Sequence, residues 1–287
     1  MHQYTIAGLS VGVSGGGLNH IPGFSTFSST YDKKNIEIII SLGETPSTYN
    51  SNTLYSFIFN ERTCEFSHSA DGYFLRMVQP DGNHLLMEMK FLEKKLFVST
   101  NMDENTPSHW LRFAVWLAFG IFSVTRQIVA IHASTVIYKG KAILFLGESG
   151  TGKSTHTRLW LKNIPDTELL NDDSPLIHAD KKNALAFGSP WSGKTPCYKN
   201  KFTSIAGIVR LSQAPHNKIT KLNKLSAIGA LLPSCPPALA YDECLSDKVC
   251  DILSSLILQV PVYSLECTPD VYATQLVYST LKKEGCI

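Results

Sequence analysis

The chain has 287 residues, of which 44% are hydrophobic, and its formal net charge is +2. This length fits one large domain or two ordinary ones, and the apolar content is that of a packed globular protein. The near balance of charge predicts no nucleic-acid partner, because nucleic-acid-binding proteins carry a clear excess of Lys and Arg. The seven cysteines include no Cys-x-x-Cys pair, which argues against a zinc site or a disulfide framework and predicts a reducing, cytoplasmic location.

Residues 1–105 contain short apolar and aromatic runs separated by Gly, Pro and Asp turns. Regular short runs of this kind predict an antiparallel sheet. We therefore expect a β-rich N-terminal domain over 1–105, which ends in a polar stretch before a helix at Ser108. The expected strands are 36–42, 53–59, 73–78, 84–89 and 95–99.

Residues 110–124 form a mostly apolar run that 128–131 extend. Arg112 interrupts the front of this run, and Arg126 with Gln127 closes it short of the roughly 20 residues that a membrane span requires. We therefore predict a buried helix between two domains and no membrane partner. The first four residues lack a basic region followed by an apolar core, so that no signal peptide is expected.

Residues 106–287 mix strand-like and helix-like runs, which predicts an α/β domain. A hairpin is expected where two apolar runs flank a short turn that contains Gly140. The expected strands are 135–138, 142–146, 169–170, 204–211 and 262–266. The expected helices are 155–162, 225–232, 242–259 and 269–283.

The most informative motif is a glycine-rich loop between an expected strand and an expected helix. Its residues are Gly147, Glu148, Ser149, Gly150, Thr151, Gly152, Lys153 and Ser154. This spacing is the phosphate-loop pattern, in which glycines let successive backbone N–H groups point at a phosphate. Lys153 offers an ammonium group to the phosphates, Ser154 can ligate Mg²⁺, and Thr155 continues into the helix, whose positive end adds to the anion site. The motif predicts ATP and Mg²⁺ as the cofactors.

Three further features accompany this loop. His132 precedes it, and the acidic doublet Asp172-Asp173 follows the expected strand 169–170. An acidic residue after a buried strand is where nucleotide enzymes place a Mg²⁺ ligand or a catalytic base, and Asp172 is the candidate metal ligand beside Ser154. The third feature is a Gly/Pro-rich turn that ends at Lys194. Lys194 and Lys199 are candidate substrate contacts, with a solvated surface as the alternative for both.

The order His-Ala-Ser, phosphate loop, Asn-Asp-Asp resembles the catalytic domain of HPr kinase/phosphorylase, whose nucleotide-binding core is similar to that of phosphoenolpyruvate carboxykinase. The similarity covers about residues 130–280, and Glu148 stands where the family usually has Asp. The resemblance implies a P-loop catalytic domain over 106–287. It also implies that Lys153 acts in catalysis, that Asp172 or Asp173 takes the proton from the acceptor, and that His132 orients this carboxylate. Members of this family often assemble into homo-oligomers.

These observations predict an ATP-dependent kinase that acts on a hydroxyl group, either a serine of a protein or peptide or a small hydroxylated metabolite. One alternative is a nucleotide-binding regulator, in which the loop changes conformation with ATP and the N-terminal domain binds a partner. A second alternative is a carboxykinase-like lyase. That enzyme requires His and Lys metal ligands and an arginine cluster, for which we find no pattern in the sequence.

Overall fold

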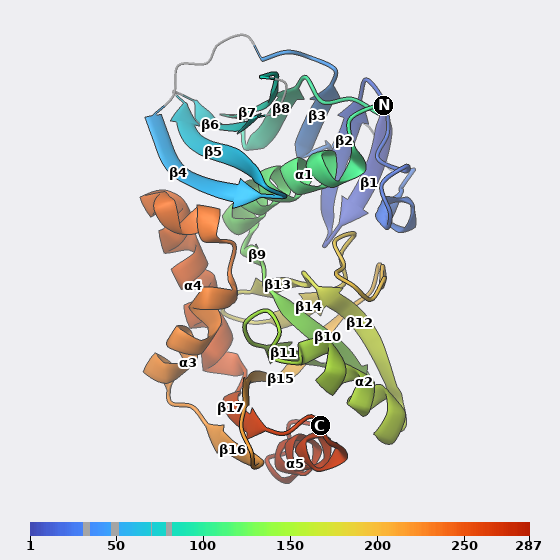
Figure 1. Cartoon of the computed structure of the whole chain (residues 1–287), viewed down its shortest axis with the longest axis vertical. Helices are drawn as coiled ribbons and strands as arrows, with labels where there is room; N and C mark the ends of the chain where they lie inside the picture. Colours follow the sequence, from blue (N-terminus) through green and yellow to red (C-terminus); the bar gives the residue numbers. More distant parts are fainter. Residues whose placement is uncertain (31–34, 47–51, 70, 79–81) are drawn as a thin grey trace. The chain divides into compact units, whose positions relative to one another are not determined.

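The computed structural model describes residues 1–30, 35–46, 52–69, 71–78 and 82–287. The chain is mixed α/β with two sheets, as the sequence predicts at this level (Figure 1). Contacts divide it into two compact units, the first of Met1–Ser123 with Ala238–Leu245, the second of Val124–Pro237 with Ser246–Ile287. Within the described ranges, no helix has the length and apolar character needed to cross a membrane.

The first unit is built on an eight-stranded sheet with the strand order β1-β2-β3-β8-β7-β6-β5-β4. The part from β4 to β8 is antiparallel, as expected, whereas β3 pairs in parallel with both β2 and β8. The sequence prediction misses β1, β2 and β5, because their many polar residues and glycines hide the apolar alternation. The strands are β1 (His2–Ile6), β2 (Leu9–Ser14), β3 (Ile38–Leu42), β4 (Asn52–Phe59), β5 (Arg62–Ser69), β6 (Gly72–Val78), β7 (His84–Leu92) and β8 (Lys95–Thr100).

Helix α1 (Ser108–Ser123) packs against the sheet of the first unit. Its Phe113 ring stacks on Phe59 with centroids 4.3 Å apart, and Trp110 meets the same ring edge-on at 5.4 Å. The expected boundary after residue 105 separates this helix from the unit with which it packs; the structure places the division after Ser123. Aromatic contacts between distant segments decide this membership, and no local sequence pattern reports them.

The second unit contains a nine-stranded sheet in which β12-β10-β11-β15-β14-β13-β9 form one path and β17 pairs with β15 and β16. Strands β11, β15 and β17 run in parallel at its centre. The expected hairpin is present, because Lys139 and Gly140 take positive φ angles of 46° and 78°, which a two-residue turn requires. The strands are β9 (Ile128–Ala130), β10 (Ala133–Tyr138), β11 (Lys141–Leu146), β12 (Thr167–Asp173), β13 (Leu176–Ala179), β14 (Ala184–Phe187), β15 (Phe202–Gln213), β16 (Lys218–Lys221) and β17 (Val262–Cys267).

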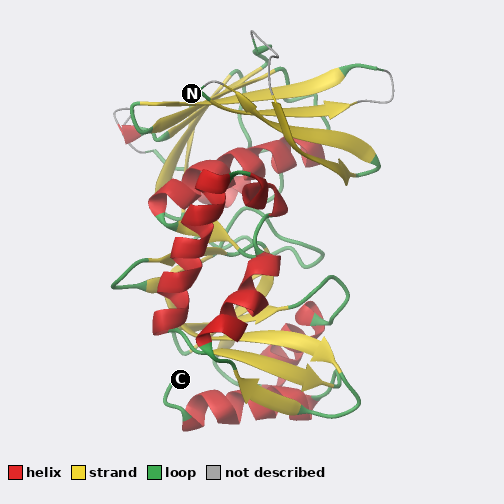
Figure 2. Ribbon diagram, turned by 90° about the vertical axis from the view of Figure 1, so that its left-hand side faces the viewer, coloured by secondary structure: helices red, strands yellow, loops and turns green. Residues whose placement is uncertain are grey.

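The helices of the second unit lie on both faces of this sheet (Figure 2). One face carries a hydrophobic core that β11, β15 and β17 share with α2 and α5, and that includes Phe145, Trp160 and Val277. On β15, Arg210 alternates with core residues and reaches the opposite side, where its Nη1 donates to the Ala230 carbonyl of α3. The helices of the second unit are α2 (Lys153–Asn163), α3 (Lys224–Leu231), α5 (Val271–Lys283), the short η3 (Val124–Arg126) and η4 (Leu232–Ser234), and all but the first three residues of α4 (Glu243–Gln259). The short helices η1 (Phe24–Phe27) and η5 (Pro237–Tyr241) belong to the first unit, apart from Pro237.

The core also contains a buried histidine on α2. His156 is 3% exposed, its ring lies 4.6 Å from that of Phe145, and its Nε2 accepts a hydrogen bond from the Trp160 indole at 3.3 Å. Burial penalises the charged imidazolium and lowers the pKa of His156 to about 4.

We predict that His156 makes the second unit sensitive to acid. Because its folded-state pKa lies below the ordinary 6.5, the unfolded chain takes up the proton first as pH falls. The neutral, buried His156 thereby contributes about 3 kcal/mol to the free energy of unfolding. This contribution is complete above about pH 6.5 and is lost progressively down to about pH 4. Urea unfolding across this range measures it.

The matched control is His216→Gln, which removes an exposed histidine paired with Glu266 and should keep the wild-type pH profile. The variant His156→Gln removes the buried titrating group and should flatten the profile. A profile of His156→Gln as steep as that of the wild type contradicts the prediction.

Candidate functional site

The register of three strands gathers the expected site at one edge of the second sheet. Ala133, the first residue of β10, lies opposite Leu146 of β11 and opposite Asp173 of β12. His132 directly precedes Ala133 and Gly147 directly follows Leu146, so that the histidine, the glycine loop and the acidic doublet lie side by side. A backbone hydrogen bond of 2.7 Å from His132 to the Ser234 carbonyl fixes the start of β10.

The glycine loop joins β11 to α2, as the sequence predicts. Gly147, Gly150 and Gly152 have φ angles of +147°, +84° and +100°, which only glycine adopts without strain. A Cβ at Gly147 would also lie 2.5 Å from the Thr151 hydroxyl oxygen. The loop therefore depends on its glycines for both conformation and space.

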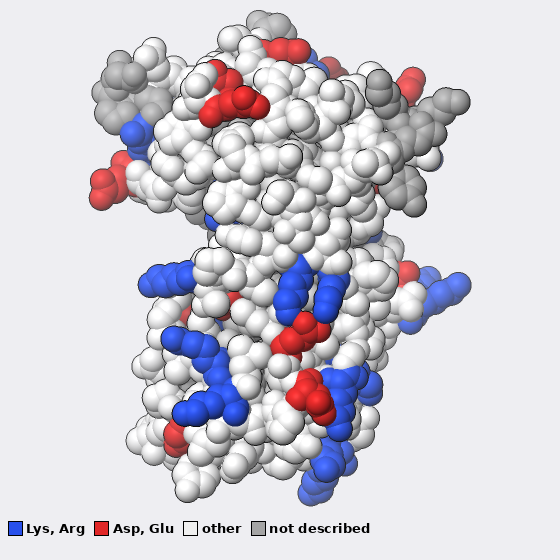
Figure 3. Space-filling model, turned by 90° about the vertical axis from the view of Figure 1, so that its right-hand side faces the viewer, with Lys and Arg blue, Asp and Glu red and all other residues white. Residues whose placement is uncertain are grey.

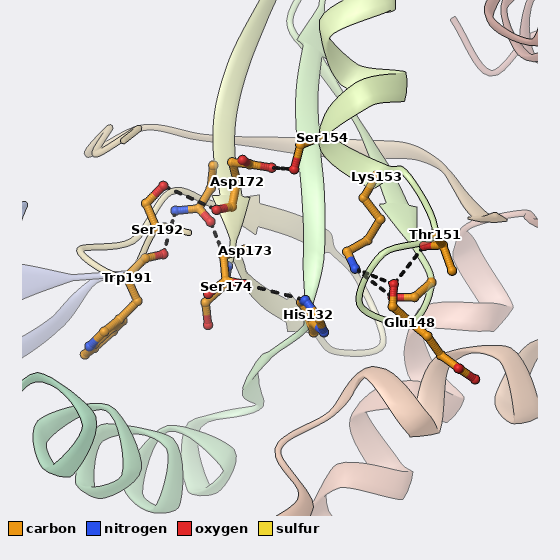
Figure 4. A network of polar contacts seen from close by, with 12 residues as sticks. His132, Glu148, Thr151, Lys153, Ser154, Asp172, Asp173, Ser174, Trp191 and Ser192 are labelled. Carbon is orange, nitrogen blue, oxygen red and sulfur yellow. Dashed lines mark hydrogen bonds and ion pairs between the residues drawn. The ribbon is translucent and has the colours of Figure 1, made fainter. Parts of the chain in front are cut away.

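Lys153 reaches back over this loop (Figure 4). Its Nζ donates to the carbonyl oxygens of Gly147 at 2.8 Å and Glu148 at 3.1 Å. Burial lowers the pKa of this ammonium group, while the carboxylates of Asp173 and Asp172 oppose the shift. The cation thus lies at the mouth of the loop, in the electrostatic field of the acidic doublet.

The structure brings Ser154 and Asp172, the two candidate metal ligands, into contact. The Ser154 hydroxyl donates to Asp172 Oδ1 at 2.9 Å, and Asp172 is almost fully buried (Figure 4). In the parts of the chain that the structure describes, no three His, Cys, Asp or Glu side chains gather as a metal cluster. A magnesium ion on phosphates uses one or two protein oxygens together with phosphate and water, so that the donor set fits this ion.

His132 lies beside the second carboxylate of the doublet. Its Nε2 is 3.5 Å from Asp173 Oδ1, and both side chains are about half exposed. Burial and then the charge of Lys153 lower the pKa of His132, against the opposite effect of Asp173 and Asp172. The imidazole is therefore mainly neutral near neutral pH.

Asp173 has a strained backbone. Its φ is +143°, a region that residues other than glycine rarely adopt. The buried Asn171 holds this strand end in place, because its Oδ1 accepts from the Ser174 N–H at 2.9 Å. Its Nδ2 donates to the Ser189 hydroxyl at 3.2 Å and to the Trp191 carbonyl at 3.1 Å. Strain that the surroundings maintain in this way is characteristic of functional sites.

The Gly/Pro-rich turn lies against the doublet. Ser192 forms an isolated β-bridge with Asp173, and its hydroxyl donates to the Asp172 carbonyl at 3.3 Å. Gly193 approaches so closely that an added Cβ would lie 3.0 Å from the same carbonyl oxygen. The structure thus brings this turn to the site, and Lys194 follows it as an exposed residue.

Lys199 is not brought to the site. Its Nζ lies 2.6 Å from the Glu168 carboxylate, which Lys201 also contacts at 3.2 Å. Glu168 is four residues before Asp172 on β12, or about 13 Å along the strand. Lys199, an expected substrate contact, therefore forms a surface ion pair instead.

On the face drawn in Figure 3, basic side chains in the lower half of the picture stand next to acidic ones in several places.

Sequence reasoning missed a second cation near the loop. Arg210 lies near the end of β15, the strand parallel to β11, and its Nη2 is 3.9 Å from Glu148 Oε1. Its charge contributes to the lowered pKa of Lys153. The only signal was an arginine at the end of an otherwise apolar strand. The structural role of Asn171 was also missed, although it precedes the acidic doublet directly.

A comparison with protein-family models finds no match for this chain, and a comparison with curated proteins finds none either.

We predict that Asn171→Ala destabilises the second unit. The change leaves the buried Ser174 N–H without its acceptor and releases the turn at Ser189, which should lower the free energy of unfolding by about 2–3 kcal/mol. Urea unfolding measures the loss. Asn163→Ala is the matched control, because Asn163 donates one hydrogen bond at an exposed helix end and its loss should change stability by less than about 0.5 kcal/mol. Equal stability of the two variants contradicts the prediction.

Proposed function

We propose that the second unit is the catalytic unit of an ATP-dependent kinase that transfers the γ-phosphoryl group of ATP to a hydroxyl group. The observation that carries this proposal is the convergence of a phosphate loop, the Ser154–Asp172 pair and the Asp173–His132 pair at one sheet edge. Phosphoryl transfer requires mainly positioning and charge neutralisation, together with a proton acceptor.

The loop and the start of α2 bind the phosphates in this proposal. Backbone N–H groups of the loop and the positive end of α2 face the anion, and the Lys153 ammonium exchanges its loop carbonyls for phosphate oxygens. Ser154 and Asp172 hold Mg²⁺, which supplies positive charge to the phosphates when bound.

Asp173 is the proposed base. Asp172 accepts a hydrogen bond from the Ser154 hydroxyl. Asp173, by contrast, lies half exposed beside His132, where the hydroxyl group of a phosphoryl acceptor can approach. The acceptor oxygen attacks the γ-phosphorus, the bond from this phosphorus to the bridging oxygen breaks, and ADP leaves. The hydroxyl proton passes to the Asp173 carboxylate, while the neutral His132 holds that carboxylate in position.

The resemblance to HPr kinase/phosphorylase supports a P-loop kinase of that kind, with a serine of a protein or peptide or a small hydroxylated metabolite as the acceptor. All seven cysteines are free thiols, which supports a reducing compartment such as the cytoplasm. Assembly into homo-oligomers remains part of what this resemblance implies.

We predict that Lys153→Ala weakens the binding of Mg·ATP by about 10- to 100-fold, because it removes charge-assisted hydrogen bonds to the phosphates. Titration calorimetry measures the affinity. Lys162→Ala, at the exposed end of the same helix, removes a lysine away from the loop and should bind as the wild type does. Unchanged affinity in Lys153→Ala rules out this role of the loop.

We predict that Asp173→Asn retains the affinity for Mg·ATP and loses turnover, because the amide has nearly the shape of the carboxylate but does not accept a proton. The expected loss is about 10²- to 10⁴-fold in ATP hydrolysis, with water in place of the natural acceptor. Asp166→Asn, on an exposed turn, is the matched control. Wild-type rates in Asp173→Asn, Asp172→Asn and His132→Ala exclude the doublet as the base. A wild type that binds ATP without turnover favours a nucleotide-binding regulator.

A further inference from the structure

A pocket lies beside the glycine loop, on the side away from the acidic doublet. Its volume is about 540 Å³, and its walls include Gly152, Thr155, His156, Gln213 and Thr268. In the sheet order, β10 and β12 lie on one side of β11, and β15 and β17 lie on the other. The doublet forms the end of β12, whereas the pocket is formed where β15 and β17 end. Open α/β sheets bind ligands at the carboxyl ends of their parallel strands.

We propose that this pocket receives the nucleoside part of the nucleoside triphosphate whose phosphates occupy the loop, an inference that rests on the proposed function. The volume lies within the roughly 300–1,000 Å³ of pockets for small ligands. Consecutive residues also point to opposite ends of the anion site: Ser154 contacts Asp172, and Thr155 lines the pocket. A triphosphate on the loop therefore has a metal end toward the doublet and a nucleoside end toward the pocket.

His156 gives this pocket a polar group with a defined hydrogen-bonding role. Its Nε2 accepts from the Trp160 indole, so that the neutral ring carries its proton on Nδ1. Within the described ranges, His156 makes one side-chain hydrogen bond, that with Trp160, so that Nδ1–H has no acceptor in the described part of the chain. His156 forms part of the pocket wall, and in this proposal its Nδ1–H donates to an acceptor nitrogen or oxygen of the nucleoside.

The pocket is also connected to the loop. Gln213, at the end of β15, donates from Nε2 to the Gly150 carbonyl at 3.1 Å. A nucleoside seated against Gln213 and His156 contacts one residue bonded to the loop and one on the helix that follows it. The pocket wall therefore sets the direction in which the phosphate chain leaves the loop.

Titration calorimetry with Mg·ATP and with Mg-bound inorganic triphosphate tests this proposal. The wild type should bind ATP at least about tenfold more tightly than triphosphate, since only ATP fills the pocket. Ala214→Trp places a large ring in the pocket wall and should reduce the affinity for ATP to that for triphosphate, which stays unchanged. Gln275→Trp, on the exposed face of α5, is the matched control and should behave as the wild type.

A second pair of variants tests the donor on His156 without leaving the indole N–H buried and unsatisfied. Trp160→Phe retains His156, and the double variant His156→Phe/Trp160→Phe removes both partners. The ratio of the two affinities should fall about tenfold from the single to the double variant, as expected for one lost hydrogen bond. An unchanged ratio overturns the role of His156.

The outcomes separate this inference from the function on which it rests. Equal affinity of the wild type for ATP and triphosphate overturns the nucleoside pocket and leaves the phosphate loop as an anion site. If neither ligand binds, the proposed kinase function fails, and the pocket assignment fails with it. Tighter binding of ATP that Ala214→Trp does not weaken places the nucleoside elsewhere and also overturns the assignment.

Discussion

The pairing of β10 with both of its neighbours is the constraint on which the candidate site depends. Ala133 lies opposite Leu146 on one side and Asp173 on the other, so that the start of β10 and the ends of β11 and β12 meet at one edge. A slip of one residue in either pair would turn every side chain to the opposite face. The pairing with β12 also contains a bulge between Thr135 and Val136, and bulges next to functional sites re-aim the side chains that follow them.

The candidate site contains a strained backbone at Asp173, and buried polar contacts nearby maintain it. A positive φ at Asp173 is unfavourable by an amount of order 1–3 kcal/mol and persists only where neighbours leave no alternative. Asn171 provides that restraint, because its amide bonds to both the strand end and the Ser189 turn in a fully buried position. In a low-dielectric interior such a network tolerates little displacement, so that the orientation of Asp173 is set by residues that do not contact a substrate.

Local patterns predicted the strand, loop and helix around Lys153, the hairpin before them, and the candidate side chains His132, Asp172 and Asp173. Each of these features is encoded in adjacent residues, such as the glycines of the loop. The partner of Lys199 and the position of Arg210 were not predictable, because cross-strand neighbours depend on register. The membership of α1 was missed for a similar reason. Its aromatic contacts with β4 join segments that are about fifty residues apart, and periodicity along one segment carries no information about them.

The glycine loop, the pocket beside it and the hydrophobic core of the second unit are connected through shared residues. Phe145 precedes the loop on β11 and Trp160 follows it on α2, and both belong to the same buried cluster. His156 contacts both of these residues and also forms part of the pocket wall. Packing on both sides therefore supports the loop in addition to its own glycines and internal hydrogen bonds. A ligand that binds only this folded arrangement adds its binding free energy to the stability of the unit. The binding of any ligand at this edge and the stability of the second unit are thus thermodynamically linked through α2.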